Sequence, residues 1–468
     1  MDSFLSKLTA IRPSENQVNW QALGFTAFLH YGINTFTNRE WGDGTENPKD
    51  YTPSDLNTDQ WCEALVSAGV KACIITAKHH DGFCLFDTAH TKHNVMYSPK
   101  PVDVVAALAA SCVKYGLKMG VYLSPWDQNA PTYGSGVAYD DFFCAQLEEL
   151  TTKYGPLYSL WFDGACGEGP NGKKQVYDWP RYYAVIRKNQ PKAVITVCGP
   201  DVRWIGNEAG YTRPSEWSVV PDRMRQAETV AALSQQSDNS TFRERPIKSE
   251  DEDLGSRELL AKELEIGGGL CWYPAEVDVS IRPGWFYHSE EDSKVRSLEN
   301  LLDIYEKSVG GNAVLLLNIP PDTKGQINAA DVARLKELGD RIRNIYSNNL
   351  LSDAVASCGQ SVLADDETYW MGNKECDEIT INLSDAKTLT HIILCEQVRE
   401  SQRIEAFTIF GEVNGKWHNL YDGTTVGFKK ICRFDATHVS GLRIVINQSR
   451  IAPTIRYIAA FNDIASAK

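Results

Sequence analysis

The chain has 468 residues, a formal net charge of −14 and an apolar content of 43%. This length exceeds one ordinary domain and suits two, and the apolar fraction is sufficient for a sizeable core. The acidic balance argues against nucleic acid and anionic membrane surfaces as partners, because both carry negative charge.

No targeting or membrane segment is expected. The first residues lack the basic and then apolar stretches of a signal peptide, and no window approaches 18 consecutive apolar residues. We therefore expect a cytoplasmic protein as the sequence stands, and a periplasmic or secreted one if a leader has been trimmed. The cysteines form no Cys-X-X-Cys pair, which favours free, reduced thiols over a metal site.

The first two-thirds of the chain alternate short apolar runs with helical patterns. The runs predict strands at 25–30, 72–77, 117–123, 158–162, 193–197, 269–273 and 313–317. The patterns predict helices at 58–68, 102–115, 140–153, 179–189, 293–307 and 331–346. Apolar strands that alternate with helices indicate a parallel sheet, and about eight such units favour a (β/α)8 TIM barrel. The alternative, a doubly wound sheet, lacks the Gly-X-Gly-X-X-Gly motif after its first strand.

The pattern changes after residue 346. Short strands with period-two alternation are predicted at 378–383, 390–394, 406–410 and 442–446, separated by turns such as Asn414-Gly415 and Asp422-Gly423. Such a series is typical of an antiparallel β-sandwich. We therefore predict a catalytic barrel at 1–346 and a C-terminal β-sandwich at 347–468.

Polar and aromatic side chains follow the predicted barrel strands, at the end where parallel barrels carry their chemistry. Histidines and carboxylates bind hydroxyl groups, tryptophan covers the apolar face of a sugar ring, and a carboxylate pair can cleave a glycosidic bond. The pattern therefore favours a barrel that cleaves sugars. The residues in question are His30, Glu40, Trp41, His79, His80, Tyr122, Trp126, Asp127, Trp161, Asp163, Glu208, Glu216 and Glu276.

Several of these residues also have a simpler explanation. His30 could be a hydrogen-bonded core histidine, and Asp163 could be a helix N-cap. A metal could bind His79-His80, but neighbouring strand residues point to opposite faces, so only one of the pair is expected to face the barrel interior. Most acidic residues in irregular segments, such as Glu208 and Glu216, are simply solvated. No cofactor or metal is predicted, and neither Gly-X-Ser-X-Gly nor a P-loop occurs.

In combination, Leu29-His30-Tyr31-Gly32, Lys78-His79-His80-Asp81-Gly82-Phe83, Trp161-Phe162-Asp163-Gly164 and the stretch 201–208 resemble the retaining α-L-fucosidase family of glycoside hydrolases. The likeness covers roughly residues 20–345, and it is strongest to the subgroup that cleaves α-1,3 and α-1,4 fucosyl linkages in branched glycans. The resemblance implies Asp163 as nucleophile and Glu208, in a Gly-Asn-Glu loop, as acid/base. Glu216 is the reserve candidate for the acid/base.

The resemblance also implies a substrate site for fucosylated, Lewis-type oligosaccharides. Phe28, Trp161 and Trp285 are candidates for the apolar wall around the sugar's methyl group. Trp126, Asp127 and Glu216 are candidates for an outer platform under the branched aglycone. The full set of expected substrate contacts is His30, Glu40, Trp41, His79, His80, Tyr122, Trp126, Asp127, Trp161, Glu216 and Trp285.

Three alternatives stay open at this point. The chain could be a different retaining barrel glycosidase, for example one that acts on galactosides. It could be a non-catalytic carbohydrate-binding protein, or a metal-dependent hydrolase that uses the histidine pair. The C-terminal sandwich resembles galactose-binding-like accessory domains, and it could bind sugar or only brace the barrel. Homo-oligomerisation is also left open.

Overall fold

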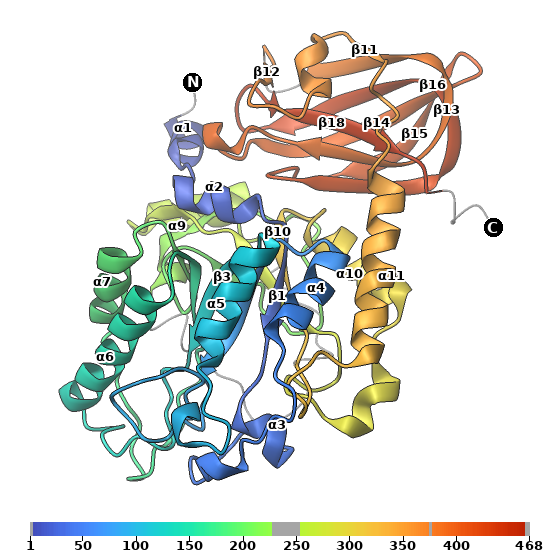
Figure 1. The fold of residues 1–468 in the computed structure, drawn as a ribbon. Helices are drawn as coiled ribbons and strands as arrows, with labels where there is room; N and C mark the ends of the chain where they lie inside the picture. The colour runs from blue at the N-terminus through green and yellow to red at the C-terminus, as the bar shows by residue number, and fades with distance from the viewer. Residues whose placement is uncertain (1–2, 227–252, 374–376, 464–468) are drawn as a thin grey trace.

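The computed structural model describes residues 3–226, 253–373 and 377–463. These form a barrel of parallel strands surrounded by helices, and a second unit of antiparallel sheets that packs against one end of the barrel (Figure 1). Part of the segment with weak strand predictions, residues 227–252, lies outside the described ranges.

Eight parallel strands form the barrel in the order β5-β4-β3-β2-β1-β10-β9-β6. A parallel bridge between Thr196 and Val202 joins the two ends of this order, so the sheet closes on itself. The predicted α/β barrel is therefore confirmed. The strands are β1 (Phe25–Leu29), β2 (Ala72–Lys78), β3 (Lys118–Leu123), β4 (Leu157–Phe162), β5 (Val194–Val197), β6 (Arg203–Trp204), β9 (Ala275–Ser280) and β10 (Ala313–Asn318).

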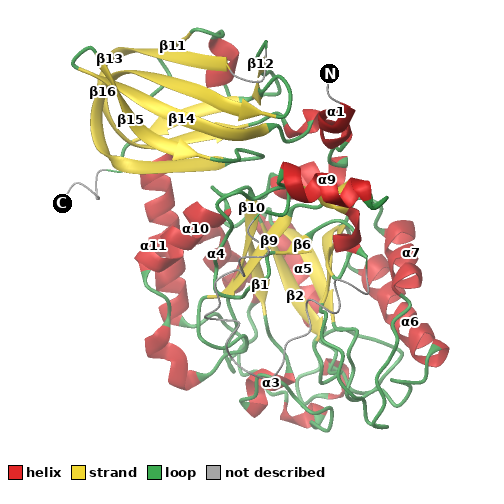
Figure 2. Cartoon of the chain, turned by 180° about the vertical axis from the view of Figure 1, so that it is seen from behind, coloured by secondary structure: helices red, strands yellow, loops and turns green. Residues whose placement is uncertain are grey.

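Helices cover the outside of the barrel (Figure 2). Their ends follow ordinary capping rules: the Asp103 side chain accepts the Ala106 N–H at the start of α5, and Gly116 ends that helix with φ 70°. Within the described ranges, none of the helices is long and apolar enough to span a bilayer. The barrel helices are α4 (Thr58–Ala68), α5 (Val104–Tyr115), α6 (Val137–Lys153), α7 (Trp179–Asn189), α9 (Arg257–Glu265), α10 (Leu298–Ser308) and α11 (Ala329–Tyr346), preceded by α1 (Ser3–Ala10), α2 (Glu15–Gln21) and the short α3 (Ile33–Thr37).

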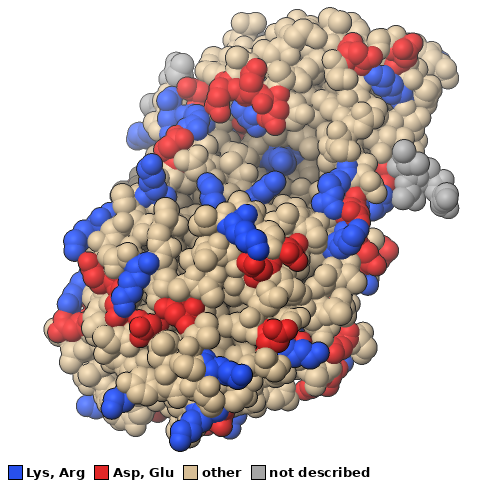
Figure 3. Space-filling view, viewed as in Figure 1, with Lys and Arg blue, Asp and Glu red and all other residues tan. Residues whose placement is uncertain are grey.

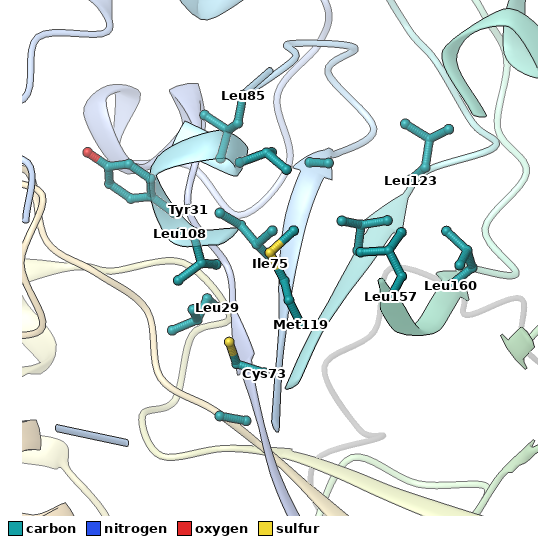
Figure 4. Packing of buried hydrophobic residues seen from close by; sticks show 14 of the residues in the cluster. Leu29, Tyr31, Cys73, Ile75, Leu85, Leu108, Met119, Leu123, Leu157 and Leu160 are labelled. Atoms are coloured by element: carbon teal, nitrogen blue, oxygen red, sulfur yellow. The ribbon is translucent and has the colours of Figure 1, made fainter. Parts of the chain in front are cut away.

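Alternation along each strand separates two layers of the core. On β2, Cys73 and Ile75 pack outward against α5, where Leu108 meets them (Figure 4). Ile74, between them, belongs to a separate interior cluster that includes Phe28. Strands buried on both faces read as continuous apolar runs, which is why most barrel strands were predictable.

Two barrel strands differ from the prediction. The run at 269–273 forms β8 (Leu270–Trp272), but it pairs antiparallel with β7 (Val219–Pro221) outside the barrel. The seventh strand is instead β9, whose sequence Ala-Glu-Val-Asp-Val-Ser alternates polar and apolar residues. Its Val277 and Val279 face the helices, so Glu276 and Asp278 face the barrel interior. The sixth strand, β6, has only two residues.

The C-terminal unit consists of antiparallel sheets, as predicted. The segments 378–383 and 390–394 are parts of one long strand, with a register shift between Asn382 and Lys387. Asn414 and Gly415 form the β14–β15 turn with φ 51° and 74°, whereas Asp422-Gly423 lies within β15 rather than in a turn. The strands are β11 (Val355–Ala356), β12 (Trp370–Met371), β13 (Asp377–Cys395), β14 (Ile404–Val413), β15 (Lys416–Gly423), β16 (Lys430–Ser449), β17 (Thr454–Ile455) and β18 (Tyr457–Phe461).

The sandwich packs on the amino-terminal end of the barrel strands. Asn312, which precedes β10, donates its N–H to Lys429 O at 3.1 Å and accepts the Phe428 N–H at 2.7 Å. Ile345 of α11 joins Ile393 and other sandwich residues in an apolar cluster. Basic side chains line part of this junction (Figure 3). The carboxyl ends of the strands lie at the other end of the molecule, where α3 follows β1 (Figure 1).

Candidate active site

His30 follows β1 and is held in one tautomer by the end of β10. Its Nδ1 lies 2.8 Å from Asn318 Oδ1. The Asn318 amide nitrogen donates to Ser280 Oγ and to the Trp285 carbonyl, so its oxygen must accept from the imidazole. Burial lowers the pKa of His30 to about 4. The imidazole is therefore neutral near pH 7, with Nε2 available as a hydrogen-bond acceptor.

Both His79 and His80 face the site, and the prediction that only one would do so is wrong. Strand β2 ends at Lys78, so the two histidines belong to a turn in which Gly82 N–H donates to His79 O. Gly82 has φ 78°, and a Cβ at this position would lie 2.4 Å from Asp127 Oδ1, so glycine is required here. The imidazole centroids are 4.1 Å apart.

The environments of these two imidazoles differ. His79 stacks on Tyr122 at 5.6 Å, and its Nδ1 is buried without a partner among the described residues. His80 Nδ1 lies 2.7 Å from Ser124 Oγ, which donates to Trp126 O and so accepts from the imidazole. Burial lowers the pKa of both groups. Two neutral imidazoles thus stand side by side at the strand ends.

Asp163 follows β4 and is partly open to solvent. Its Oδ2 accepts the Tyr122 hydroxyl at 3.3 Å and lies 3.8 Å from His80 Nε2. Its Oδ1 accepts the Ala165 N–H at 2.7 Å, an interaction that orients the carboxylate. The carboxylate is thus fixed from both sides while 27% of its side chain stays exposed.

Glu208 lies on the loop after β6 and is also partly exposed. Its Oε2 accepts the Trp285 Nε1–H at 3.2 Å, and the Trp285 ring centroid lies 5.0 Å from that of His30. The preceding Asn207 is fully buried, and its Oδ1 accepts the N–H groups of Ala209 and Tyr211. Asn207 therefore fixes the turn that carries Glu208.

Two further carboxyl groups lie in the barrel interior on β9: Glu276, which was expected only in the segment after the run at 269–273, and Asp278, which was not among the expected site residues. Glu276 is fully buried and accepts the Trp161 Nε1–H at 2.8 Å, and burial raises its pKa to about 7. Asp278 accepts the Trp204 Nε1–H at 2.6 Å. Burial and then the nearby Glu208 charge hold the Asp278 pKa well above its usual value.

Glu40, Trp41 and Trp126 form the rim of the site. Both carboxylate oxygens of Glu40 accept backbone N–H groups, from Trp285 at 2.9 Å and Phe286 at 3.1 Å, so this residue anchors the Trp285 loop. Trp41 is 42% exposed and meets Trp126 edge-on at 5.7 Å. Trp126 is half-buried, and its ring centroid lies 4.9 Å from that of the buried His80, so it connects the exposed Trp41 to the interior.

Two predicted substrate residues lie away from the site. Asp127 is buried, and its carboxylate pairs with the buried Lys78 at 2.9 Å, so it is not part of an open platform. Glu216 is also buried, and its carboxylate pairs with Arg203 and Arg213. Because Trp204 faces the barrel interior, its neighbour Arg203 faces outward, and Glu216 lies outside the barrel with it. Neither position supports the predicted contact with substrate.

The site also contains residues that the sequence analysis missed. Phe286 packs edge-on against His30 and His79, with centroid distances of 5.5 and 5.0 Å. Asn318 and Ser124 set the histidine tautomers. Asn318 stands directly at a strand end, and this position could have identified it. Across the described ranges, no group of three or more His, Cys, Asp or Glu residues is arranged to hold a metal ion.

A parallel barrel that presents carboxylates, neutral imidazoles and tryptophans at the carboxyl ends of its strands has the construction of a barrel glycoside hydrolase. Comparison with known proteins narrows this class. The model of the α-L-fucosidase family matches residues 20–344, which is more than half of the chain. The chain therefore belongs to the α-L-fucosidase family, glycoside hydrolase family 29.

Individual relatives match nearly the whole chain. The chain is 35% identical to "Alpha-L-fucosidase 1" of Arabidopsis thaliana, and the match covers 96% of this chain and 87% of the relative. The solved structure of a Bacteroides ovatus protein is 44% identical, with a TM-score of 0.86 over 98% of this chain and 76% of the other. A Ruminococcus gnavus fucosidase solved with fucose is 28% identical, with a TM-score of 0.83 over 97% of this chain and 95% of the other. These matches favour an enzyme over a sugar-binding protein and a fucosidase over a galactosidase.

Proposed function

We propose that this enzyme is a retaining, exo-acting α-L-fucosidase that removes terminal α-1,3- or α-1,4-linked fucose from branched oligosaccharides. One observation carries the proposal: a continuous set of contacts connects the two candidate catalytic carboxylates. Glu208 binds Trp285, which packs on His30, and Tyr122 lies between His79 and Asp163. Both carboxylates thus border the same group of imidazoles.

The mechanism follows from the roles of two carboxylates in retaining glycosidases. Asp163 attacks the anomeric carbon, the glycosidic C–O bond breaks, and protonated Glu208 gives its proton to the leaving oxygen. A covalent fucosyl-enzyme results. Glu208 then takes a proton from water, the water oxygen bonds to the anomeric carbon, and the bond to Asp163 breaks. Fucose leaves with its original anomeric configuration.

Neutral histidines suit a substrate whose polar groups are uncharged hydroxyls. His30 and His80 each donate Nδ1–H to the protein, which leaves Nε2 to accept a hydrogen bond from a sugar hydroxyl. Trp161 and Trp285 belong to an interior aromatic cluster above the buried Phe28. We infer that this cluster provides the apolar wall for the methyl group of the 6-deoxy sugar.

The Trp41–Trp126 pair, of which Trp41 is exposed and Trp126 half-buried, supports a branched substrate. Tryptophan faces bind sugar rings, and this pair lies beside His80 at the rim of the site. We infer that the pair contacts the sugar next to fucose. Enzymes with such a platform use the binding energy of the aglycone to reach the transition state. The kcat/KM on a Lewis-type trisaccharide should therefore exceed that on a simple aryl fucoside, and the reverse order would assign the broader fucosidase subgroup.

The carboxylate roles are tested by fucose release from the trisaccharide with Asp163→Ala and Glu208→Ala, each with and without azide. Both variants should lose at least about 10²-fold in kcat/KM. With azide, the Glu208 variant should form a fucosyl azide of retained configuration, because azide attacks the covalent intermediate. The Asp163 variant should form the fucosyl azide of inverted configuration, because azide replaces the nucleophile.

Glu168→Ala is the matched control, since Glu168 is an exposed carboxylate on the loop that follows Asp163. This variant should keep wild-type rates. Full activity of the Glu208 variant, or a retained azide product from the Asp163 variant, would reject the assignment.

A further inference from the structure

The loop that carries Glu208 is tied together at its two ends. Residues 205–213 leave β6 and return toward β7, and Arg213 donates from its guanidinium to the Ile205 carbonyl at 3.1 Å. A Cβ on Gly210 would lie 2.9 Å from Ile304, so the loop packs closely on α10. Thr212 also donates to the Lys307 carbonyl of that helix at 3.1 Å. The position of Glu208 therefore depends on contacts at the base of its loop.

Glu216 connects the residues on either side of this loop. Its Oε1 accepts from Arg203, which precedes the loop, and its Oε2 lies 3.5 Å from Arg213, which ends the loop. The side chains of all three residues are at most 5% exposed. Desolvation offsets much of the attraction in such a buried ion pair, so its net contribution to stability is small. We infer that its main effect here is on the geometry of the two segments it joins.

The sandwich holds Glu216 from the other side. Gln402 is fully buried, its Nε2 donates to the Glu216 carbonyl at 3.1 Å, and its Oε1 accepts the Ser218 N–H at 2.8 Å. Thr424 and Thr425, which follow β15, lie against the same segment: Thr424 donates to Pro214 O at 2.8 Å and Thr425 to Glu216 O at 3.5 Å. The segment after the Glu208 loop is thus bound directly to the second domain.

We propose that Arg203, Arg213, Glu216 and Gln402 form a clamp that positions Glu208, so that the C-terminal sandwich acts on the leaving-group step of the reaction. Glu216 and Gln402 are positioning residues within this clamp, because neither lies at the site itself. The inference rests on the proposed role of Glu208 as acid/base.

The clamp predicts a specific kinetic defect. A general acid must lie within hydrogen-bond reach of the leaving oxygen, and displacement by about 1 Å can cost about 10² in rate. A displaced Glu208 slows only substrates whose leaving group needs a proton. Loss of fold, in contrast, slows every substrate equally. The ratio of rates on a poor and a good leaving group therefore distinguishes positioning from stability.

The experiment compares kcat/KM on a Lewis-type trisaccharide with that on α-L-fucosyl fluoride, whose leaving group needs little acid assistance. Gln402→Met keeps the side-chain volume and removes the hydrogen bonds of Gln402 with Glu216 and Ser218, and a longer one from Asn312 Nδ2 at 3.5 Å. It should lose about 10-fold on the trisaccharide and less than about 2-fold on the fluoride. Glu216→Gln should show the same selectivity when measured well below its melting temperature.

Arg341→Met is the matched control. It breaks another ion pair between barrel and sandwich, Arg341 with Asp463 at 2.5 Å, which belongs to α11 and lies outside the clamp. This variant should slow both substrates by the same factor or neither. Equal losses on the two substrates for Gln402→Met, or the selective defect in Arg341→Met, would overturn the clamp.

The Glu208→Ala variant separates this inference from the proposed function. If it shows the selective loss and Gln402→Met does not, Glu208 is the acid/base and the clamp is wrong. If Glu208→Ala loses equally on both substrates, Glu208 is not the acid/base, and both that assignment and the clamp are wrong. Should Glu216→Gln not fold, Gln402→Met alone decides the question.

Discussion

Burial determines the protonation of most titratable groups around the barrel interior. It lowers the pKa values of His30, His79 and His80, and it raises those of Glu276 and Asp278. The His30 imidazole and the Glu276 carboxyl are then both neutral between about pH 4 and about pH 7, which suits an uncharged sugar. The opposite shifts also give opposite effects of pH on stability.

Glu276→Gln should stabilise the protein increasingly as the pH rises above 4.5, and fully above about pH 7. The folded-state pKa of Glu276, about 7, exceeds the ordinary value of 4.5, so wild type loses stability as pH rises from 4.5 to 7. Above pH 7 the full penalty, on the order of 3 kcal/mol, is present. Glutamine mimics the protonated carboxyl and avoids this penalty. Urea unfolding at pH 4.5 and pH 8 measures the effect, and equal stabilisation at both values would contradict the burial argument.

His30→Gln should weaken the acid sensitivity of the fold. The folded-state pKa of His30, about 4, lies below the ordinary 6.5, so its contribution is fully present above pH 6.5 and is lost as pH falls toward 4. The loss for His30 is on the order of 3 kcal/mol. Unfolding free energies at pH 7 and pH 5 should therefore differ less in the variant. An unchanged difference would show that His30 is protonated in the folded protein.

At the scale of elements, a buried ion pair holds the two strand-end segments on either side of His80. Lys78, the last residue of β2, donates to Asp127 after β3 at 2.9 Å and to Gln146 of α6 at 3.0 Å. Asp127 also accepts the N–H groups of Asn129 and Ala130, and Gln128 N–H donates to the His80 carbonyl. The pair thus supports the turn that presents the histidines.

Lys78→Met should destabilise the protein by about 3–5 kcal/mol, because it leaves the Asp127 carboxylate buried without a counter-ion. Adding Asp127→Asn removes that charge and should recover part of the loss. The double-mutant cycle is measured by urea unfolding at neutral pH. If the double variant is less stable than Lys78→Met by the full cost of Asp127→Asn alone, the two residues are not coupled.

Sequence periodicity predicted the elements whose two faces are both apolar and failed where function changes one face. β1 to β5 and β10 read as continuous apolar runs and were found at nearly their true positions. The sequence of β9 alternates because its interior face carries Glu276 and Asp278, so periodicity predicts the apolar run at 269–273 as the barrel strand instead. The two residues of β6 are too few for any periodicity.

The candidate site was predicted to a similar extent. The strand-end rule located His30, His79, His80 and Asp163 because it depends on position along the chain. The rule could not distinguish residues whose side chains face the site from residues whose side chains form buried ion pairs. Asp127 and Glu216 have acidic side chains in suitable segments, yet Lys78, Arg203 and Arg213 bind them elsewhere. No spacing rule in the sequence identifies Lys78, Arg203 and Arg213 as the partners of these carboxylates.

At the scale of the whole molecule, barrel and sandwich share extensive buried contacts. Ile345 of α11 packs with Ile393 and Ile431 of the sandwich, and a second cluster joins Leu8 of α1 to Val398. Arg257 and Glu405 add a bidentate ion pair across the same junction. Contacts of this kind make independent folding of either unit unfavourable.

We therefore expect one unfolding transition for the full chain. Tryptophan fluorescence, which reports mainly the barrel, and far-ultraviolet circular dichroism should give the same urea midpoint. A protein consisting of residues 1–346 should be poorly soluble, because the apolar surface under the sandwich becomes exposed. Two separated midpoints, or a soluble and folded barrel fragment, would show that the units fold separately.

The mouth of the barrel, meaning the carboxyl ends of its strands with the candidate active site, lies at the end of the barrel axis opposite to the sandwich (Figure 1). An attachment made through the sandwich, to a resin or to a second enzyme, therefore leaves the mouth facing outward. Glycans borne on bulky glycoproteins could then reach the immobilised enzyme without steric interference from its support. Coupling through exposed side chains near Trp41 would have the opposite effect, because it would turn the mouth toward the support.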